Sequence, residues 1–150
     1  MASTPVTATA TEADAQYVFD EWHRCVIKAD VDALIALYTD DAVVETPTAV
    51  VRMNRESGLL SGKEQVAAFL RENFKERQKM NSTLDTTQFY RSGVYQFNGR
   101  TLTWEYPRKT PAGDAVDISE VLDLQGPKIQ AHRMYFGWFT LASLSKRTKS

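Results

Sequence analysis

One carboxylate and one imidazole near the carboxyl end of the chain are the residues best suited to acid/base chemistry. Two stretches, 117–126 (DISEVLDLQG) and 129–138 (IQAHRMYFGW), alternate apolar and polar residues, with a Gly-Pro pair between their strand-like parts. Successive side chains of a strand point to opposite faces, so these stretches predict a hairpin with one inward face. Glu120 and His132 both fall on that face. If three residues close the turn, Glu120 lies directly opposite His132.

Such a pair could exchange a proton with a bound ligand. Histidine is the side chain whose ordinary pKa lies nearest neutrality, and a carboxylate beside it titrates as part of the pair. General acid/base catalysis by positioned groups contributes about 10²–10⁴ in rate. Two other interpretations stay open. The pair could simply satisfy its own buried polar groups, or a four-residue turn could place Glu120 opposite Arg133 as an ordinary salt bridge.

Helices must come first in the chain to position these strands. The spacing of apolar residues predicts a helix over 14–29 and, after an Asp30 N-cap, a second short helix that includes Tyr38. Residues 42–46 are expected to form a strand that Pro47 stops. The next residues, 48–60, are expected to be a loop with a short extended piece at 50–52.

A third helix and further strands complete the pattern. Ser61 and Glu64 are spaced as a capping box, which predicts a helix whose buried stripe begins at Val66. Segments 84–91 and 101–109 are expected to be strands, and 111–114 a turn. Helices followed by antiparallel strands predict an α+β fold. We expect a cone-shaped fold in which the N-terminal helices pack in a strongly curved, mixed and mainly antiparallel sheet.

The composition excludes several classes of protein. A length of 150 residues is that of one domain, and 18 Lys and Arg against 19 Asp and Glu give no basic field for nucleic acid. The single cysteine, Cys25, excludes an internal disulfide and fits a reducing compartment, so we expect a cytoplasmic protein. No apolar run approaches the length of a membrane span. We expect residues 1–13 to be a disordered leader, 14–141 the domain and 142–150 a basic tail.

No cofactor or metal is expected. The two histidines lie on separate elements without the spacing of a ligand set, and no glycine-rich phosphate loop is present. His23 is expected on the surface of the first helix, and Cys25 in the core.

Three segments resemble the nuclear transport factor 2-like superfamily, and within it the SnoaL-like and ketosteroid-isomerase-like domains. They are 29–47 (ADVDALIALYTDDAVVETP), 61–70 (SGKEQVAAFL) and 124–138 (LQGPKIQAHRMYFGW), within a resemblance that covers about residues 14–140. The resemblance implies a cone-shaped α+β fold with an apolar pocket inside. It also implies a homodimer packed through the outer face of the sheet. In this chain that contact would include Val121, Arg133 and Tyr135.

The catalytic residue sets of the known members of this superfamily are not retained. Ketosteroid isomerases carry an aspartate base before the proline that ends the first strand, where this chain has Thr46. Their oxyanion-binding tyrosine resembles Trp22 here, and only their protonated carboxylic acid has a counterpart, in Glu120. The aspartate of SnoaL-like cyclases is matched by Met134. The arginine and two aspartates of limonene-epoxide-hydrolase-like members are missing as well.

We therefore expect a small-molecule enzyme, an isomerase, lyase or cyclase, that uses Glu120 and His132 for acid/base chemistry on an apolar substrate. The alternative is a non-catalytic small-ligand-binding or dimerisation module of the same fold. Aromatic and apolar side chains at inward positions are expected to line the pocket, with Tyr106 and Trp22 supplying hydrogen-bond donors. These lining residues are Trp22, Val18, Thr46, Trp104, Tyr106, Leu122, Met134 and Phe136. Neither nucleic acid nor a membrane is expected as a partner.

Overall fold

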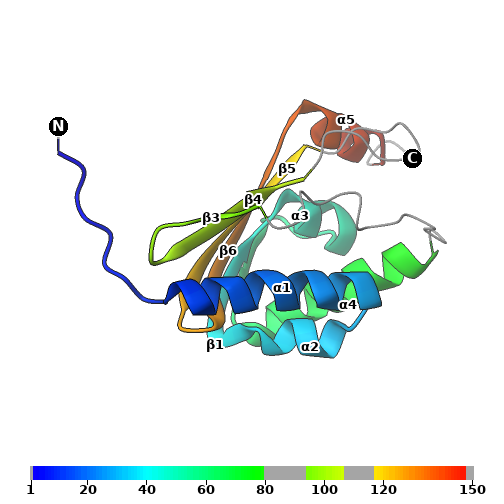
Figure 1. Cartoon of the computed structure of the whole chain (residues 1–150). Coiled ribbons are helices and arrows are strands. Elements are labelled where there is room, and N and C mark those ends of the chain that lie inside the picture. The colour runs from blue at the N-terminus through cyan, green and yellow to red at the C-terminus, as the bar shows by residue number, and fades with distance from the viewer. Residues whose placement is uncertain (1, 80–93, 107–116, 148–150) are drawn as a thin grey trace.

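The computed structural model describes residues 2–79, 94–106 and 117–147. Its elements follow one another as helices first and then mainly strands (Figure 1). In chain order they are α1 (Glu12–Lys28), α2 (Val31–Ala36), β1 (Tyr38–Glu45), α3 (Pro47–Met53), β2 (Leu59–Ser61), α4 (Lys63–Lys79), β3 (Gln96–Phe97), β4 (Thr101–Glu105), β5 (Ile118–Gln125), β6 (Lys128–Phe136) and α5 (Trp138–Arg147).

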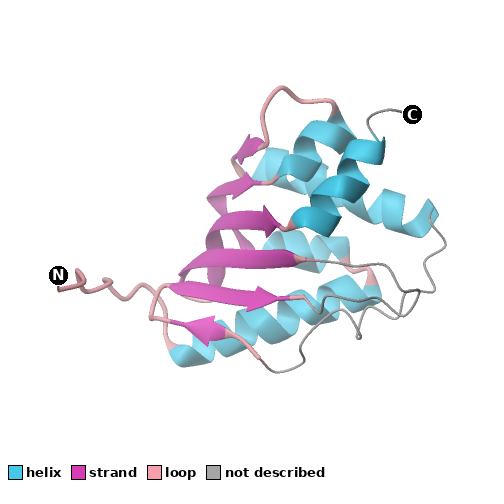
Figure 2. Ribbon diagram, turned by 90° about the horizontal axis from the view of Figure 1, so that it is seen from above, coloured by secondary structure: helices cyan, strands magenta, loops and turns pink. Residues whose placement is uncertain are grey.

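The described strands form one mixed sheet in the order β2-β1-β6-β5-β4-β3. β1 and β6 run parallel, and the other neighbouring pairs run antiparallel. The sheet curves strongly, and α1, α2 and α4 lie together against one side of it (Figure 1). Seen from above, the strands lie side by side with the helices gathered along that side (Figure 2). The expected α+β fold, with N-terminal helices packed in a curved mixed sheet, is confirmed.

Local capping explains where the first helices begin. The Thr11 side chain accepts a hydrogen bond from the backbone of Asp14, whose own side chain accepts one from Thr11, so the two form a capping box at α1. Asp30 caps α2 through the backbone N–H of Ala33, as expected. These contacts fix the entry of the two helices that cover the sheet.

Two expectations about the region after α2 are wrong. Tyr38 is the first residue of β1 rather than part of the helix, and residues 39–41 continue that strand. The expected loop contains the helix α3, because the Thr46 side chain accepts a hydrogen bond from the backbone of Thr48 and Pro47 occupies the first turn. Proline fits there because the first turn of a helix leaves its N–H groups unpaired.

Two further boundaries differ from expectation. Ser61 ends β2, and its backbone N–H donates to the side chain of Gln65 at 3.0 Å rather than forming part of a capping box with Glu64. The last strand ends at Phe136, and Trp138, which is 74% exposed, begins α5. The expected strand at 84–91 and the expected turn at 111–114 lie outside the described residues.

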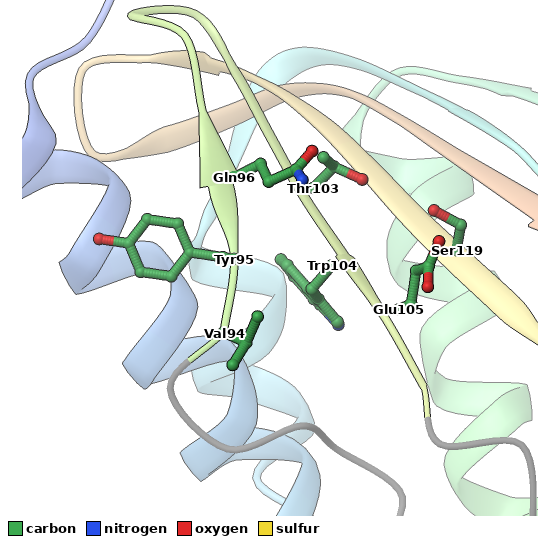
Figure 3. A pocket seen from close by; sticks show the side chains of 7 residues that line it. All are labelled: Val94, Tyr95, Gln96, Thr103, Trp104, Glu105 and Ser119. Atoms are coloured by element: carbon green, nitrogen blue, oxygen red, sulfur yellow. The ribbon is translucent and has the colours of Figure 1, made fainter.

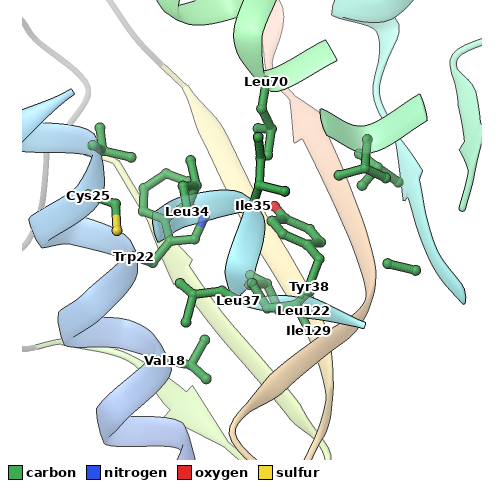
Figure 4. Packing of buried hydrophobic residues seen from close by; sticks show 14 of the residues in the cluster. Val18, Trp22, Cys25, Leu34, Ile35, Leu37, Tyr38, Leu70, Leu122 and Ile129 are labelled. Carbon is green, nitrogen blue, oxygen red and sulfur yellow. The ribbon is translucent and has the colours of Figure 1, made fainter. Parts of the chain in front are cut away.

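The core fills the space between the helices and the inward face of the sheet. Side chains from α1, α2, α4 and the central strands meet there (Figure 4). Labelled members in that view include Val18, Trp22 and Cys25 from α1 and Leu122 from β5. Cys25 is buried, as expected. Among the helices that the structure describes, none is long and apolar enough to cross a membrane.

The segment before α1 is bound to the sheet. Thr9 and Ala10 donate backbone hydrogen bonds to the carbonyl of Gly99, and Gly126 donates to the carbonyl of Thr9. The Thr9 hydroxyl also donates to the carbonyl of Leu124. These contacts join two hairpin turns at the narrow end of the fold.

Candidate active site

Four polar side chains form a continuous hydrogen-bonded chain inside the fold. The Tyr38 hydroxyl lies 2.8 Å from Nδ1 of His132, and Nε2 of His132 lies 2.5 Å from Oε2 of Glu120. The Tyr106 hydroxyl donates to Oε1 of Glu120 at 2.7 Å. The acid and the imidazole singled out by the sequence are therefore in contact, and two tyrosines extend that contact in both directions.

The strand register that brings the pair together differs from the expected one. A two-residue turn closes the hairpin, and Leu122 rather than Glu120 lies opposite His132. Glu120 lies opposite Met134, two pairs further along the strands. A β-bulge at Gln130, which has no partner residue on β5, shifts the later pairs by one residue. Glu120 and His132 therefore lie on the same face of the sheet. The contact between the two side chains is thus diagonal.

The alternative pairing of Glu120 with Arg133 is wrong. Arg133 lies opposite Val121 and donates two hydrogen bonds to the carboxylate of Asp123, at 2.9 and 3.1 Å. Burial raises the pKa of Asp123, but its hydrogen bonds with Arg133 and Thr101 outweigh that effect and hold the pKa below its ordinary value. This salt bridge lies on the outward face of the sheet, away from the face that carries Glu120 and His132.

Burial decreases along the chain from its inner end to its outer end. Tyr38 and His132 are each 1% exposed and Glu120 is 4% exposed, whereas Tyr106 is half-buried. Tyr106 lines a hollow of about 260 Å³ at the ends of β4, β5 and β6. The hollow is lined by Glu105, Tyr106, Asp117, Ile118, Ser119, Tyr135, Phe136 and Gly137. Of the four residues, Tyr106 is the one that lines this hollow.

The inward face of the sheet carries three successive rows of side chains, and the predicted lining residues of the strands lie among them. Tyr106, Ile118 and Phe136 lie nearest the hollow, with Tyr106 donating a backbone hydrogen bond to Ile118. The middle row across β4, β5 and β6 is Trp104, Glu120 and Met134. The inner row is Leu102, Leu122 and His132. Trp104 and Leu122 are buried, and Met134 and Phe136 are half-buried.

In the hollows formed by residues 2–79, 94–106 and 117–147, the predicted lining residues are divided among different places. Val18 and Trp22 are buried on α1. Thr46 is buried at the start of α3 and lines, together with Met134, a separate hollow of about 420 Å³. A third hollow, of about 160 Å³, lies beside β3 and β4, and there Trp104 points away from Thr103 (Figure 3).

His23 was expected on the surface of α1, but its ring packs among other aromatic rings. Its ring packs against Phe19, Trp22 and Trp104, with centroid separations of 4.2, 5.3 and 5.1 Å. Its Nδ1 lies 2.6 Å from the carbonyl oxygen of Phe19. Burial lowers the pKa of His23, and this outweighs the opposite effects of the Phe19 carbonyl and of the charges on Asp20 and Glu120. The interior wall near Glu120 therefore carries a second imidazole.

The sequence did not single out Tyr38 as part of the site. Burial, and after it the charge of Glu120, raise the pKa of the Tyr38 hydroxyl well above its ordinary value, although a hydrogen bond with Trp22 lowers it in part. Its ring also lies roughly parallel to that of His132, at a centroid separation of 6.1 Å and an interplanar angle of 27°. The alternation of Tyr38, Ala42 and Val44 as buried residues marks it as part of the strand.

The acid and the imidazole of the site are fully engaged in hydrogen bonds with protein groups. Glu120 has both carboxylate oxygens in hydrogen bonds, one toward the buried His132 and one toward Tyr106 at the hollow. Both ring nitrogens of His132 are engaged with protein side chains. Within residues 2–79, 94–106 and 117–147, no group of three or more His, Cys, Asp or Glu side chains could hold a metal ion.

The strand order, the curvature and the helices on one side of the sheet define the cone-shaped fold of the nuclear transport factor 2-like superfamily. The match extends to the sequence: residues 19–132 fit the family model of the SnoaL-like domain, and the chain belongs to that family. No curated protein matches the chain.

Solved structures agree with this assignment at the level of the fold. A SnoaL-like protein of unknown function from Burkholderia thailandensis is 22% identical, with a TM-score of 0.64, over 88% of this chain and 100% of that one. An NTF2-like protein from Anabaena variabilis is 18% identical, with a TM-score of 0.59, over 91% and 96% of the two chains. A proposed polyketide cyclase from Xanthomonas campestris is 15% identical, with a TM-score of 0.58, over 90% and 97%.

Proposed function

We propose that this protein is a small-molecule enzyme of the isomerase, lyase or cyclase type that does acid/base chemistry on an apolar substrate. The observation that carries the proposal is a carboxylate, Glu120, that is 4% exposed yet hydrogen-bonded to a tyrosine lining a hollow. Glu120 is the proton-transferring group. His132 lies behind it and supports its orientation, since both imidazole nitrogens are already bonded inside the protein.

The surroundings of Glu120 support an apolar substrate. Its neighbours across the strands are Trp104 and Met134, and Phe136 and Ile118 lie between them and the hollow's rim. These apolar neighbours favour an apolar ligand, while polar groups of the hollow such as Glu105, Asp117 and Ser119 would set its orientation. The SnoaL-like family and the similarity to a proposed polyketide cyclase point to the same class of chemistry.

Turnover of a panel of compounds tests the proposal. Apolar cyclic ketones, epoxides and polyketide-like aromatics are incubated with the protein in D₂O, and products or hydrogen exchange are followed by NMR. Replacing Glu120 by Gln keeps the size of the side chain but removes its basicity, so turnover should fall about 10²–10⁴-fold. Glu64→Gln, on the exposed side of α4, is the matched control and should retain full turnover. Turnover that survives in Glu120→Gln would refute the assignment of Glu120.

A non-catalytic binding module is the second candidate, and one observation favours it. Every oxygen of Glu120 and every ring nitrogen of His132 already has a protein partner, which is what a purely structural polar pair requires. Under that function, the variants Glu120→Gln and His132→Ala would lose stability or ligand affinity, and the wild-type protein would turn over no compound of the panel.

We also propose a homodimer and a cytoplasmic location, since the family resemblance and the single cysteine favour them. The outer face of the sheet, including Val121, Arg133 and Tyr135, is the proposed contact, and Tyr135 is 57% exposed there. Light scattering of the purified chain should give the mass of a dimer, and Tyr135→Glu should give that of a monomer. A monomeric wild-type chain would contradict this part of the proposal.

A further inference from the structure

The direction of the hydrogens along the buried chain is set at its inner end. Tyr38 is 1% exposed, and within the described part of the chain its hydroxyl forms its hydrogen bond with Nδ1 of His132. Because burial raises the pKa of Tyr38, its hydroxyl keeps its single hydrogen. That hydrogen points to Nδ1 of His132, 2.8 Å away. Trp22 and Tyr38 both lie in the core between α1 and the sheet (Figure 4).

The same reasoning continues through the imidazole. A ring nitrogen that accepts a hydrogen bond carries no hydrogen, so the hydrogen of a neutral His132 lies on Nε2. Nε2 then donates to Oε2 of Glu120 at 2.5 Å. From the other side, Tyr106 donates to Oε1 at 2.7 Å. Both oxygens of Glu120 are thus acceptors, which is the pattern of an ionised carboxylate.

The packing of Tyr38 holds the imidazole in this orientation. Val44 on β1 lies beside His132 on the parallel strand β6, and the Tyr38 ring lies roughly parallel to the imidazole ring. Tyr38 and His132 are each 1% exposed, so water does not compete for Nδ1. A hydrogen bond to the second ring nitrogen is the usual way in which proteins select one tautomer of histidine.

We infer that Tyr38 is a positioning residue that holds His132 in the tautomer with its hydrogen on Nε2, so that Glu120 rests as a carboxylate and receives a ligand's proton through Tyr106. The second half of this inference rests on the proposed function. In the step, the ligand's hydrogen moves to the Tyr106 oxygen while the hydroxyl hydrogen of Tyr106 moves to Oε1 of Glu120. Glu120 becomes a neutral acid, Tyr106 remains a hydroxyl, and the bonding electron pair stays on the ligand.

This assignment defines the substrate by its chemistry. A resting carboxylate behind a tyrosine can take up a proton but has none of its own to give in the first step. The first event is therefore removal of a hydrogen that the ligand itself acidifies, for example one next to an electron-withdrawing group. Ligands that need protonation first, such as epoxides opened by an acid, fit the arrangement less well.

Nitrogen-15 NMR of the whole chain with labelled histidine tests the tautomer without any ligand. In the wild-type protein, Nδ1 of His132 should resonate as an unprotonated nitrogen and Nε2 as a protonated one. Tyr38→Phe keeps the ring but removes the hydroxyl, and should convert this pattern into a mixture of tautomers. Tyr17→Phe, at an exposed position of α1, is the matched control and should leave the pattern unchanged.

Each outcome decides between the alternatives. A protonated Nδ1 in the wild-type protein, or a pattern that Tyr38→Phe leaves unchanged, would overturn the inference. The wild-type spectrum alone decides this if Tyr38→Phe does not fold. Tyr106→Phe should keep the tautomer while turnover falls at least tenfold, and full turnover in that variant would overturn the proton route. Absence of turnover in every protein would instead refute the proposed function and leave the tautomer assignment standing.

Discussion

Replacing His132 by Leu should destabilise the fold strongly, because it leaves one oxygen of the buried Glu120 carboxylate without its hydrogen-bond donor. Glu120 is 4% exposed and cannot regain water in the folded state. Removing the partner of a buried charged group costs about 3–5 kcal/mol, out of the 5–15 kcal/mol typical of a domain's free energy of unfolding. For a chain of this size the melting temperature should fall by about 6–20 °C. His23→Leu, which removes the hydrogen bond to the Phe19 carbonyl, should cost about 1 kcal/mol and is the control.

The double variant separates this reasoning from a simple loss of packing. Glu120→Leu with His132→Leu removes the stranded charge, and buried ion pairs replaced by apolar residues are often neutral in stability. The unpaired Tyr38 hydroxyl still costs about 1–3 kcal/mol. The double variant should therefore be more stable than His132→Leu alone. Urea unfolding followed by tryptophan fluorescence and circular dichroism measures all free energies of unfolding. A double variant that loses as much as the two single variants together would refute the coupling.

Three further predictions concern other parts of the structure. Burial raises the pKa of Asp117, but hydrogen bonds from Thr140 and the start of α5 outweigh it, so the net pKa is lowered. Its stabilisation of α5 should be complete above the ordinary carboxyl value of about 4 and be lost as pH falls through the lower folded pKa. Amide hydrogen exchange in α5 should show this step, and Asp117→Asn should abolish it; a step that persists in this variant contradicts the prediction. A Cβ at Gly58 would lie 2.6 Å from the carbonyl oxygen of Thr46, so Gly58→Ala should cost about 1–3 kcal/mol in urea unfolding, and an unchanged midpoint would count against it. Burial raises the pKa of Cys25 to about 11, so a thiol reagent at pH 8 should react far more slowly with the native chain than with the urea-unfolded one, and equal rates would argue against the burial.

The periodic spacing of apolar residues was enough to predict the α+β class and to place Glu120 and His132 on the inward faces of their own strands. Such a pattern depends only on the period of a strand, which is local. It could not place Tyr38, because a run of apolar residues after an N-cap satisfies a helix and a strand equally well for short lengths. His23 was misplaced for a related reason. Its position on α1 lies one step from the apolar stripe, and the approach of Trp104 from β4 is a long-range contact that helical spacing cannot predict.

The contact between the acid and the imidazole depends on a feature that alternation does not encode. The two-residue turn pairs Gln125 with Lys128. If that register continued along the strands, Glu120 would lie opposite Arg133, and His132 would lie on the face of the sheet away from Glu120. The bulge at Gln130 adds one residue to β6, shifts every later pair by one and returns His132 to the face of Glu120. Ile129, before the bulge, and His132, after it, are both buried although they are three residues apart. The irregularity in β6 is therefore what allows one sheet face to carry both apolar side chains and the hydrogen-bonded pair of Glu120 and His132.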